Sequence, residues 1–344
     1  MNKRTKVIQD FILNNVSEHP KDISRLTSEK FGITRQAAYY HLSKLVSEGI
    51  LAAKGSNRNR EYILLPLVAF NVTFSLDNLN LAEDKMWREY IVDRLIELPK
   101  NVIDICQYGF TEMVNNVIDH SEGTKLEIFI EQNHNDIEMS VVDDGVGIFN
   151  KIKKVFNLDD PLHSLLELSK GKLTTDPDRH TGEGIFFTSR TFDMFVIKSG
   201  NISFAHADAM GKGDFLLEHK DNYVNGTSIM MCISSDSDRT LQKIFSKYTD
   251  NYGFTKTLVP VFLSAYGDEN LVSRSQAKRL LSRFEIFKEI ILDFSNVDSI
   301  GQAFADEVFR VFKNQHPDIY IYPIKTNNQV AKMINHVTGG KLEL

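Results

Sequence analysis

Hydrophobic and polar positions change their period several times along the chain, and each change marks a structural element. Residues 7–16 and 22–32 carry apolar side chains at helical spacing, and Gly32 ends the second run. A third helical run, RQAAYYHLSKLVSEGIL, follows directly. Residues 50–64 then form two short apolar runs around a turn rich in Gly, Asn and Arg, which predicts a hairpin with a basic tip.

The middle of the chain mixes helical and alternating patterns. Residues 110–120 have helical period, with a buried stripe that includes Phe110 and Val117. Alternating runs predict strands at 125–131, 137–142, near 193–198, near 213–219 and from 226 onward. By contrast, residues 66–86 have a mixed pattern and are expected to form only a connector.

The last hundred residues alternate between strand and helix patterns. They predict an apolar run at 258–263, a helix at 275–284, a buried strand at 289–294, a helix at 302–312, a strand at 319–322 and a helix at 328–336. This alternation is typical of a small α/β sandwich. We therefore expect a multidomain α/β (α+β) protein, divided into 1–65, a connector 66–86, 87–235 and 250–344.

Composition narrows the class of protein. The 344 residues are 42% hydrophobic and 25% charged, as in ordinary globular proteins. The two cysteines, Cys106 and Cys232, lie far apart in apolar runs, and no stretch reaches the ~20 apolar residues of a membrane span. The amino terminus has charge but no apolar core of an export signal. We expect a cytoplasmic protein without a disulfide framework and without membrane contact.

The charge is unevenly distributed. Residues 1–60 hold eleven Lys and Arg against five Asp and Glu, a net charge of +6. The other 284 residues must therefore carry −12, because the whole chain has a net charge of −6. Phosphate neutralisation by basic side chains is the main sequence-independent contribution to nucleic-acid binding. A small basic module on an acidic body therefore suggests DNA as a partner, although a basic face is often only solvated surface.

Two helices joined by a glycine turn, with a polar second helix and a basic hairpin, are typical of groove-binding modules. Residues ITRQAAYYHLSKLVSEGIL…G…REYIL resemble the winged helix-turn-helix domains of bacterial transcription regulators. That resemblance implies DNA contacts from the second helix and the wing, and the alternative is a protein-interaction module. The expected DNA-contacting residues are Arg35, Gln36, Tyr39, Lys44, Lys54, Arg58 and Arg60.

A candidate site begins on the helix FTEMVNNVIDH. Glu112, Asn116 and Asp119 follow one another at spacings of four and three, which brings them together on one face. An amide oxygen and phosphate oxygens suit Mg²⁺, and a nearby carboxylate can deprotonate an attacking hydroxyl. The alternative is a helix whose exposed face is simply polar.

Two glycine-containing motifs follow this helix. The strand at 137–142 runs into DDGVGI, where Asp143 could accept a hydrogen bond from an adenine amino group. The later motif TGEGIFF places a glycine turn at the start of a helix, which presents N–H groups to phosphates. Later still, GTSI begins an apolar strand at Gly226.

In this order and spacing the motifs resemble the GHKL superfamily, the Bergerat-fold ATP-binding domains of DNA gyrase, Hsp90, MutL and histidine kinases. The resemblance implies Asn116 as the Mg²⁺ ligand, Asp143 as the adenine-reading acid and Glu112 as the general base of an ATPase. It also implies a lid over 149–180, where Lys172, Arg179 or His180 could reach a γ-phosphate. The residues expected to bind ATP are Asn116, Asp119, Asp143, Gly145, Gly147, Ile148, Thr181, Gly182, Gly184, Ile185 and Thr227.

The last domain resembles a third family. ILDFSNVDSIGQAFADEVFRVF is similar to the STAS fold of anti-sigma-factor antagonists, and more closely to the STAS-like domains fused to such ATPases. The acceptor serine of the antagonists corresponds here to Ala303, with Ser295 or Ser299 as less favoured substitutes. Self-phosphorylation is therefore not expected, and the domain is expected to contact a protein partner or to sense nucleotide.

Three functions fit these features. The leading hypothesis is an ATP-dependent DNA-binding regulator, working as a homodimer with Mg²⁺ and ATP in the central domain. The second is a serine/threonine protein kinase of the anti-sigma-factor type that acts on a separate partner. The third is an ATPase component of a defence or stress system whose winged helix holds a protein. No histidine-phosphorylation segment precedes residue 87, so autophosphorylation on His is not expected.

Overall fold

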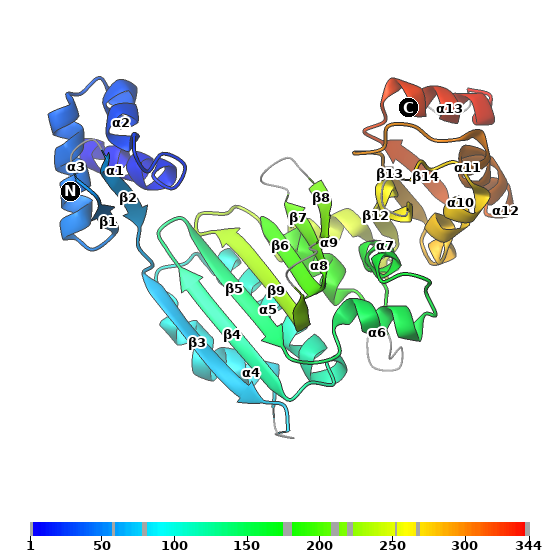
Figure 1. The fold of residues 1–344 in the computed structure, drawn as a ribbon, viewed down its shortest axis with the longest axis horizontal. Coiled ribbons are helices and arrows are strands. Elements are labelled where there is room, and N and C mark those ends of the chain that lie inside the picture. The colour runs from blue at the N-terminus through cyan, green and yellow to red at the C-terminus, as the bar shows by residue number, and fades with distance from the viewer. Residues whose placement is uncertain are drawn as a thin grey trace.

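The fold comes from a computed structural model that describes residues 3–56, 59–77, 81–174, 181–207, 213–218, 223–251, 253–265 and 269–340. Three parts follow one another along the chain and across the molecule (Figure 1). An amino-terminal unit lies at one end, a large sheet with its helices lies in the middle, and a carboxy-terminal unit lies at the other end.

The amino-terminal unit has the three helices and the hairpin that the sequence predicts. Its elements are α1 (Lys3–Asn15), α2 (Ile23–Phe31), α3 (Arg35–Ser47), β1 (Leu51–Lys54) and β2 (Glu61–Leu64). Gly32 ends α2 in the left-handed conformation, and the Thr34 hydroxyl caps α3 by accepting from the N–H of Ala37 at 3.1 Å. Ile12, Ile23 and Leu42 belong to a core that is confined to this unit.

The central unit is built on a seven-stranded sheet in the order β3-β4-β5-β9-β6-β7-β8, and all of its strand pairs are antiparallel. The strands are β3 (Val68–Ser75), β4 (Lys125–Gln132), β5 (Asp136–Asp143), β6 (Met194–Gly200), β7 (Ile202–Ala207), β8 (Gly213–Glu218) and β9 (Val224–Ser234). The strands expected from alternation are therefore present.

The expectation that residues 66–86 form only a connector is wrong for residues 68–75. Residues 68–75 form β3, which pairs with β4 over its whole length as an edge strand of the sheet. Its residues alternate between half-buried and exposed, because one side of this strand faces solvent. The sheet therefore begins near residue 68 rather than at 87, and the amino-terminal unit joins it through residues 65–67.

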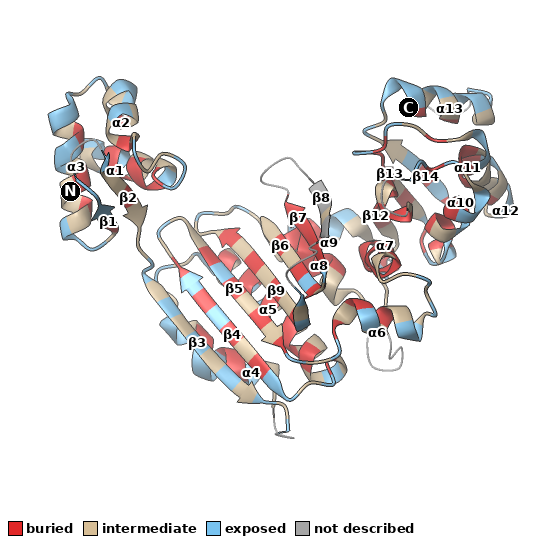
Figure 2. Ribbon diagram, in the orientation of Figure 1, coloured by how far each residue is buried: buried red, intermediate tan, exposed pale blue. Residues whose placement is uncertain are grey.

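Helices cover one face of this sheet, with α5 packed on β5 and β9, and α8 packed on β6 (Figure 1). The helical elements of this unit are α4 (Glu83–Met86), the turns Trp87–Ile91 and Val92–Arg94, α5 (Lys100–His120), α6 (Ile148–Val155), α7 (Leu162–Lys170), α8 (Gly184–Thr191) and α9 (Leu241–Tyr248). The segment 149–180, expected to be a lid, thus contains most of α6 and all of α7 in its described part, 149–174. Figure 2 shows α7 buried along nearly its whole length.

The carboxy-terminal unit is the small α/β sandwich that the sequence predicts, after a short hairpin of β10 (Thr249–Asp250) and β11 (Gly253–Phe254). Its three strands are parallel, in the order β12-β13-β14. Its elements are β12 (Lys256–Pro260), a turn at Val261–Ser264, α10 (Arg274–Leu281), a turn at Phe284–Ile286, β13 (Glu289–Asp293), α11 (Gln302–Asp306), a π-helical turn at Glu307–Val311, α12 (Phe312–Gln315), β14 (Tyr320–Ile324) and α13 (Asn328–Thr338).

The central and carboxy-terminal units share one continuous hydrophobic core. At their junction the ring of Phe254 lies 4.7 Å from that of Phe186, 5.0 Å from that of Phe187 and 5.4 Å from that of Phe287. Aromatic contacts of this kind bury large apolar areas and favour one fixed geometry. The two units are therefore packed together, whereas the amino-terminal unit keeps its own core.

Candidate functional site

One pocket in the central unit gathers most of the residues that the sequence nominates. The nominated residues that line it are Glu112, Asn116, Asp143, Gly147, Ile148, Thr181, Gly182, Gly184, Ile185 and Thr227. They come from α5, the end of β5, the start of α6, the start of α8 and β9. Asp119 and Gly145 do not line the pocket. Asp119 is exposed about one turn beyond Asn116, and Gly145 donates its N–H to Asp143 Oδ1.

Asp143 is the last residue of β5 and is only 5% exposed. Its Oδ1 accepts hydrogen bonds from the N–H of Gly145 at 2.8 Å and from the N–H of Thr227 at 3.3 Å. Burial raises the pKa of this carboxyl group, and the two backbone hydrogen bonds oppose the rise. The side chain is therefore a fixed, buried acceptor at the pocket wall.

Thr227 connects strands β5 and β9 to α6, one of the helices that line the pocket. It stands opposite Asp143 in the β5–β9 pair, and its hydroxyl accepts from the N–H of Ile148 at 3.0 Å. Gly147 precedes α6 with φ +82°, a conformation that residues with a side chain rarely adopt. These contacts hold the start of α6 over the pocket.

The opposite wall is made by α5 and the amino-terminal end of α8. The Glu112 carboxylate lies so close to Gly184 that a Cβ atom at that position would collide with it. Glu112 therefore lies against the start of α8, where the helix dipole favours negative charge. Asn116 lines the pocket one turn further along α5.

Acidic groups are concentrated at this wall. Burial raises the pKa of Glu183, between the two glycines of the turn, while Lys172 lowers it. Burial also raises the pKa of Tyr108, and the nearby charges of Glu112 and Glu183 add to the rise. An anionic ligand would have to be accommodated here by N–H groups and by a cation.

Lys172, Arg179 and His180 were the residues expected to reach a γ-phosphate from the lid. Lys172 is described, and its neighbours Leu173 and Thr174 line the pocket, but Arg179 and His180 lie outside the described residues. In the described part of the chain, no group of three or more His, Cys, Asp or Glu side chains is placed to hold a metal ion. Magnesium bound by one amide oxygen together with phosphate oxygens would not need such a group.

Sequence reasoning missed about half of the pocket lining. The missed residues are Val117, His120, Ser121, Lys151, Ile152, Leu168, Leu173, Thr174, Glu183 and Ile229. His120 could have been found, because it follows Asn116 by four residues on α5. Glu183 could also have been found, because it lies within the glycine motif. Leu168 comes from α7, which lies in the segment 149–180 that was expected to be a lid, so its place in the pocket wall was not expected.

Of the residues expected to contact DNA, those that the structure describes lie on α3 and beside or in the β1–β2 hairpin. Arg35, Gln36, Tyr39 and Lys54 are exposed, whereas Lys44 and Arg60 are half-buried. Arg60 Nη1 donates to the Tyr39 hydroxyl at 2.6 Å, which joins the hairpin to α3 as one surface. Lys44 pairs with Glu48 at 3.7 Å, and Arg58 lies outside the described residues.

Comparison with known families identifies one part of the chain. A family model described as a STAS-like domain of unknown function (DUF4325) matches residues 276–331. This range runs from within α10 to the start of α13, so the carboxy-terminal unit contains a STAS-like domain, as its sequence predicts. No curated protein matches the chain significantly. Within the described residues, no helix has both the length and the apolar character to cross a bilayer.

Proposed function

We propose that this protein is an ATP-binding, DNA-binding regulator in which a GHKL-type, Bergerat-fold central unit controls a winged helix-turn-helix unit. The observation that carries the proposal is the convergence of motifs centred on residues 112–116, 143–148, 181–185 and 227 on one pocket. These motifs are separated by up to about a hundred residues, and the simple alternative of unrelated polar turns gives no reason for them to meet.

Each part of the pocket suits one part of ATP. Asp143, buried and fixed by two N–H groups, suits the exocyclic amino group of adenine. The glycine turn and the start of α8 suit the phosphates, because helix N-termini attract anions. Asn116 would hold Mg²⁺, which would neutralise phosphate charge near the acidic wall. Glu112 would act as the general base toward water.

The test compares wild type with Glu112→Gln, and uses Asp104→Asn, an exposed carboxylate on the same helix, as the control. We expect wild type to bind and hydrolyse Mg-ATP. Glu112→Gln should bind it with similar affinity but lose about 10²–10⁴-fold in turnover, and Asp104→Asn should behave as wild type. Absence of ATP binding to wild type by calorimetry would refute the nucleotide proposal.

A protein kinase is an alternative outcome of the same experiment. Ala303 stands exposed at the start of α11, so the position of the usual acceptor has no hydroxyl group. If the protein consumes ATP only when a co-purified partner is present and that partner gains phosphoserine, the kinase function replaces the ATPase function. A homodimer and a protein partner for the STAS-like domain remain part of the proposal in both cases.

The DNA-binding function rests on the amino-terminal surface. Arg35 and Lys54 are exposed on adjacent elements, and the Arg60–Tyr39 contact joins α3 to the hairpin. A helix with a basic hairpin beside it suits a major groove and the neighbouring backbone. Fluorescence anisotropy with duplex DNA should detect binding that weakens steeply with salt. No binding at low salt would favour a protein-holding role for this unit.

A further inference from the structure

The most informative feature outside the predicted motifs is the segment that separates the pocket from the STAS-like domain. This segment runs from α7 to Thr174. All residues of α7 from His163 to Lys170 are buried. On the pocket side, Leu168, Leu173 and Thr174 form part of the wall. On the other side, α7 packs against β12 and the turn Val261–Ser264.

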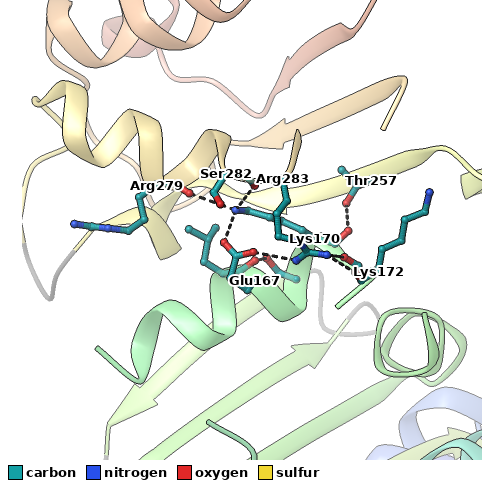
Figure 3. Close-up of polar contacts among 10 residues, drawn as sticks. Glu167, Lys170, Lys172, Thr257, Arg279, Ser282 and Arg283 are labelled. Carbon is teal, nitrogen blue, oxygen red and sulfur yellow. Dashed lines mark hydrogen bonds and ion pairs between the residues drawn. The ribbon is translucent and has the colours of Figure 1, made fainter. Parts of the chain in front are cut away.

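A buried cluster of charges ties this segment to the STAS-like domain (Figure 3). Lys170 has a fully buried side chain, and its Nζ donates to Glu167 Oε1 at 2.6 Å and to the carbonyl oxygen of Ser282 at 2.8 Å. Arg283 donates from Nη1 to Glu167 Oε2 at 3.0 Å. Buried charges are costly unless every partner is present, so the cluster favours one arrangement of the two units.

Arg283 also donates hydrogen bonds to the backbone of the pocket wall. Its Nη2 donates to the carbonyl oxygen of Gly171 at 3.2 Å and to that of Lys172. The Lys172 ammonium group lies 5.2 Å from the centre of the Phe287 ring. A guanidinium group can donate in several directions from one rigid plane, so a single side chain holds Glu167 and two carbonyl groups at once.

The wall in turn holds the glycine turn. The N–H of Leu173 donates to the carbonyl oxygen of Gly182 at 3.1 Å. The backbone of Leu173 approaches Gly182 so closely that a side chain at position 182 would have no room. A continuous path of contacts therefore runs from Arg283 through Gly171–Leu173 to the turn that opens α8.

We propose that the STAS-like domain completes the nucleotide pocket, with Arg283 as a positioning residue that fixes the wall 171–174 and, through it, the glycine turn. The identity of the ligand as ATP rests on the proposed function, but the fixing of the wall does not. Because coupling between two sites is reciprocal, a partner that shifts this domain would change ATP affinity, and ATP would change the docking of the domain.

The first test measures hydrogen exchange without nucleotide. In Arg283→Met, we expect peptides covering 162–174 and 181–190 to exchange faster than in wild type, while the strands of the STAS-like domain stay protected. The matched control is Arg310→Met, which removes an arginine from an exposed ion pair of the same domain. Unchanged exchange at 171–174 in Arg283→Met would overturn the proposal, whether or not the protein binds ATP.

The second test measures ATP affinity by calorimetry. We expect Arg283→Met to bind ATP at least about fivefold more weakly than wild type and Arg310→Met, as for typical couplings between sites. Arg283→Lys keeps the positive charge but cannot hold Glu167 and both carbonyl groups together, so its affinity should lie between the two. Equal affinities in all variants would contradict the proposal, whereas failure of wild type to bind ATP would contradict only the proposed function.

Wild type alone provides the third test, which does not depend on the stability of any variant. Saturating Mg-ATP should slow hydrogen exchange at 279–287, the segment that carries Arg283 and Phe287. A merely structural role for Arg283 would not produce this response to a ligand bound on the far side of the wall. ATP binding without any change at 279–287 would show that the domain is not coupled to the pocket.

Discussion

At the scale of single residues, Asp143 provides the sharpest test of which base the pocket takes. In Asp143→Asn, the amide oxygen has to face the N–H groups of Gly145 and Thr227, so the NH₂ group would face the pocket. This NH₂ group and the amino group of adenine are both donors, so they would oppose each other. The oxygen at C6 of hypoxanthine could instead accept a hydrogen bond from the NH₂ group. We expect ATP affinity to fall about 10- to 100-fold, since a hydrogen bond to a charged group contributes about 1.5–3 kcal/mol.

Competition between ATP and ITP gives the measurement for this substitution. The ratio of ATP to ITP affinity should fall in Asp143→Asn and stay at the wild-type value in Asp144→Asn. Asp144 is the neighbouring residue, and its carboxylate binds the backbone of Thr124 and Lys125 instead of facing the pocket. An unchanged ratio in Asp143→Asn would mean that this carboxyl group does not read the base.

The same residue predicts a pH dependence. Burial raises the pKa of Asp143 above its ordinary value of 3.8, so the group takes up a proton at a higher pH than an exposed Asp. The ionised form is the stronger acceptor for the adenine amino group, and the proton of the neutral form turns one oxygen into a donor. Affinity for adenosine, which has no phosphate to titrate, should be full at neutral pH and fall as the pH drops through this raised pKa. Asp143→Asn should show no such fall.

Lys170 predicts a large effect on stability. In Lys170→Met, Glu167 keeps Arg283 but loses its closest cation in a buried site, so we expect a loss of about 3–5 kcal/mol, as for other broken buried pairs. The double variant Glu167→Gln/Lys170→Met should recover part of that loss. Trp87, the single tryptophan, is buried in the core shared by the two units and can report urea unfolding. If Lys170→Met is as stable as wild type, the charge cluster does not contribute to the free energy of unfolding as proposed.

At the scale of elements, the sequence predicts the two terminal units well, but it misses α6, α7, α9, β3 and β7 of the central unit. The helices of the amino-terminal and STAS-like units were expected because each has one apolar face, and their strands were expected because they are short apolar or alternating runs. The helix α7 was not expected because the segment 149–180 was assigned to a lid, and nothing in the sequence indicates that Glu167 and Lys170 are buried along with its leucines. The edge strand β3 was taken for a connector because it is nowhere fully buried.

The residues of the candidate site show the same difference between local patterns, which the sequence reveals, and long-range packing, which it does not. Residues in short motifs, such as Asp143 and Gly184, were found because their local chemistry is visible in the sequence. Leu168 and Leu173 were missed because they belong to no motif, and their place in the pocket wall depends on how α7 packs against α6, α8 and the STAS-like domain. Long-range contacts of this kind leave no periodic trace, so a pocket wall that rests against another unit has to be read from the structure.

The surface of α3 and the hairpin predicts a salt-dependent interaction with DNA. Arg35→Ala and Lys54→Ala should each weaken DNA binding and reduce the slope of log affinity against log salt by about 1, since one phosphate contact is lost. Lys6→Ala is the control, because Lys6 is exposed on α1 of the same unit. Anisotropy titrations at several salt concentrations measure the slope. Equal slopes for all three variants would remove this surface from the DNA-binding model.

At the scale of the whole molecule, the two proposed binding sites lie at opposite ends of the central strands. The amino-terminal unit contacts the turn between β4 and β5, where Asn135 Nδ2 donates to the carbonyl oxygen of Leu13 at 2.8 Å. Asp143 stands at the other end of β5, eight residues long, which spans roughly 25 Å at the usual rise per residue. Any effect of ATP on DNA binding within one chain therefore has to cross the sheet.

Asn135 lies at the point where such an effect would reach the amino-terminal unit. We expect Mg-ATP to change the DNA affinity of wild type by about fivefold or more, within the usual range of coupling between sites. In Asn135→Ala, DNA affinity without ATP and ATP affinity without DNA should both stay close to wild type, because neither proposed surface includes this residue. The change in one affinity caused by the other ligand should shrink. DNA titrations with and without Mg-ATP on both proteins measure it, and undiminished coupling in Asn135→Ala would mean that the signal passes through a second subunit instead.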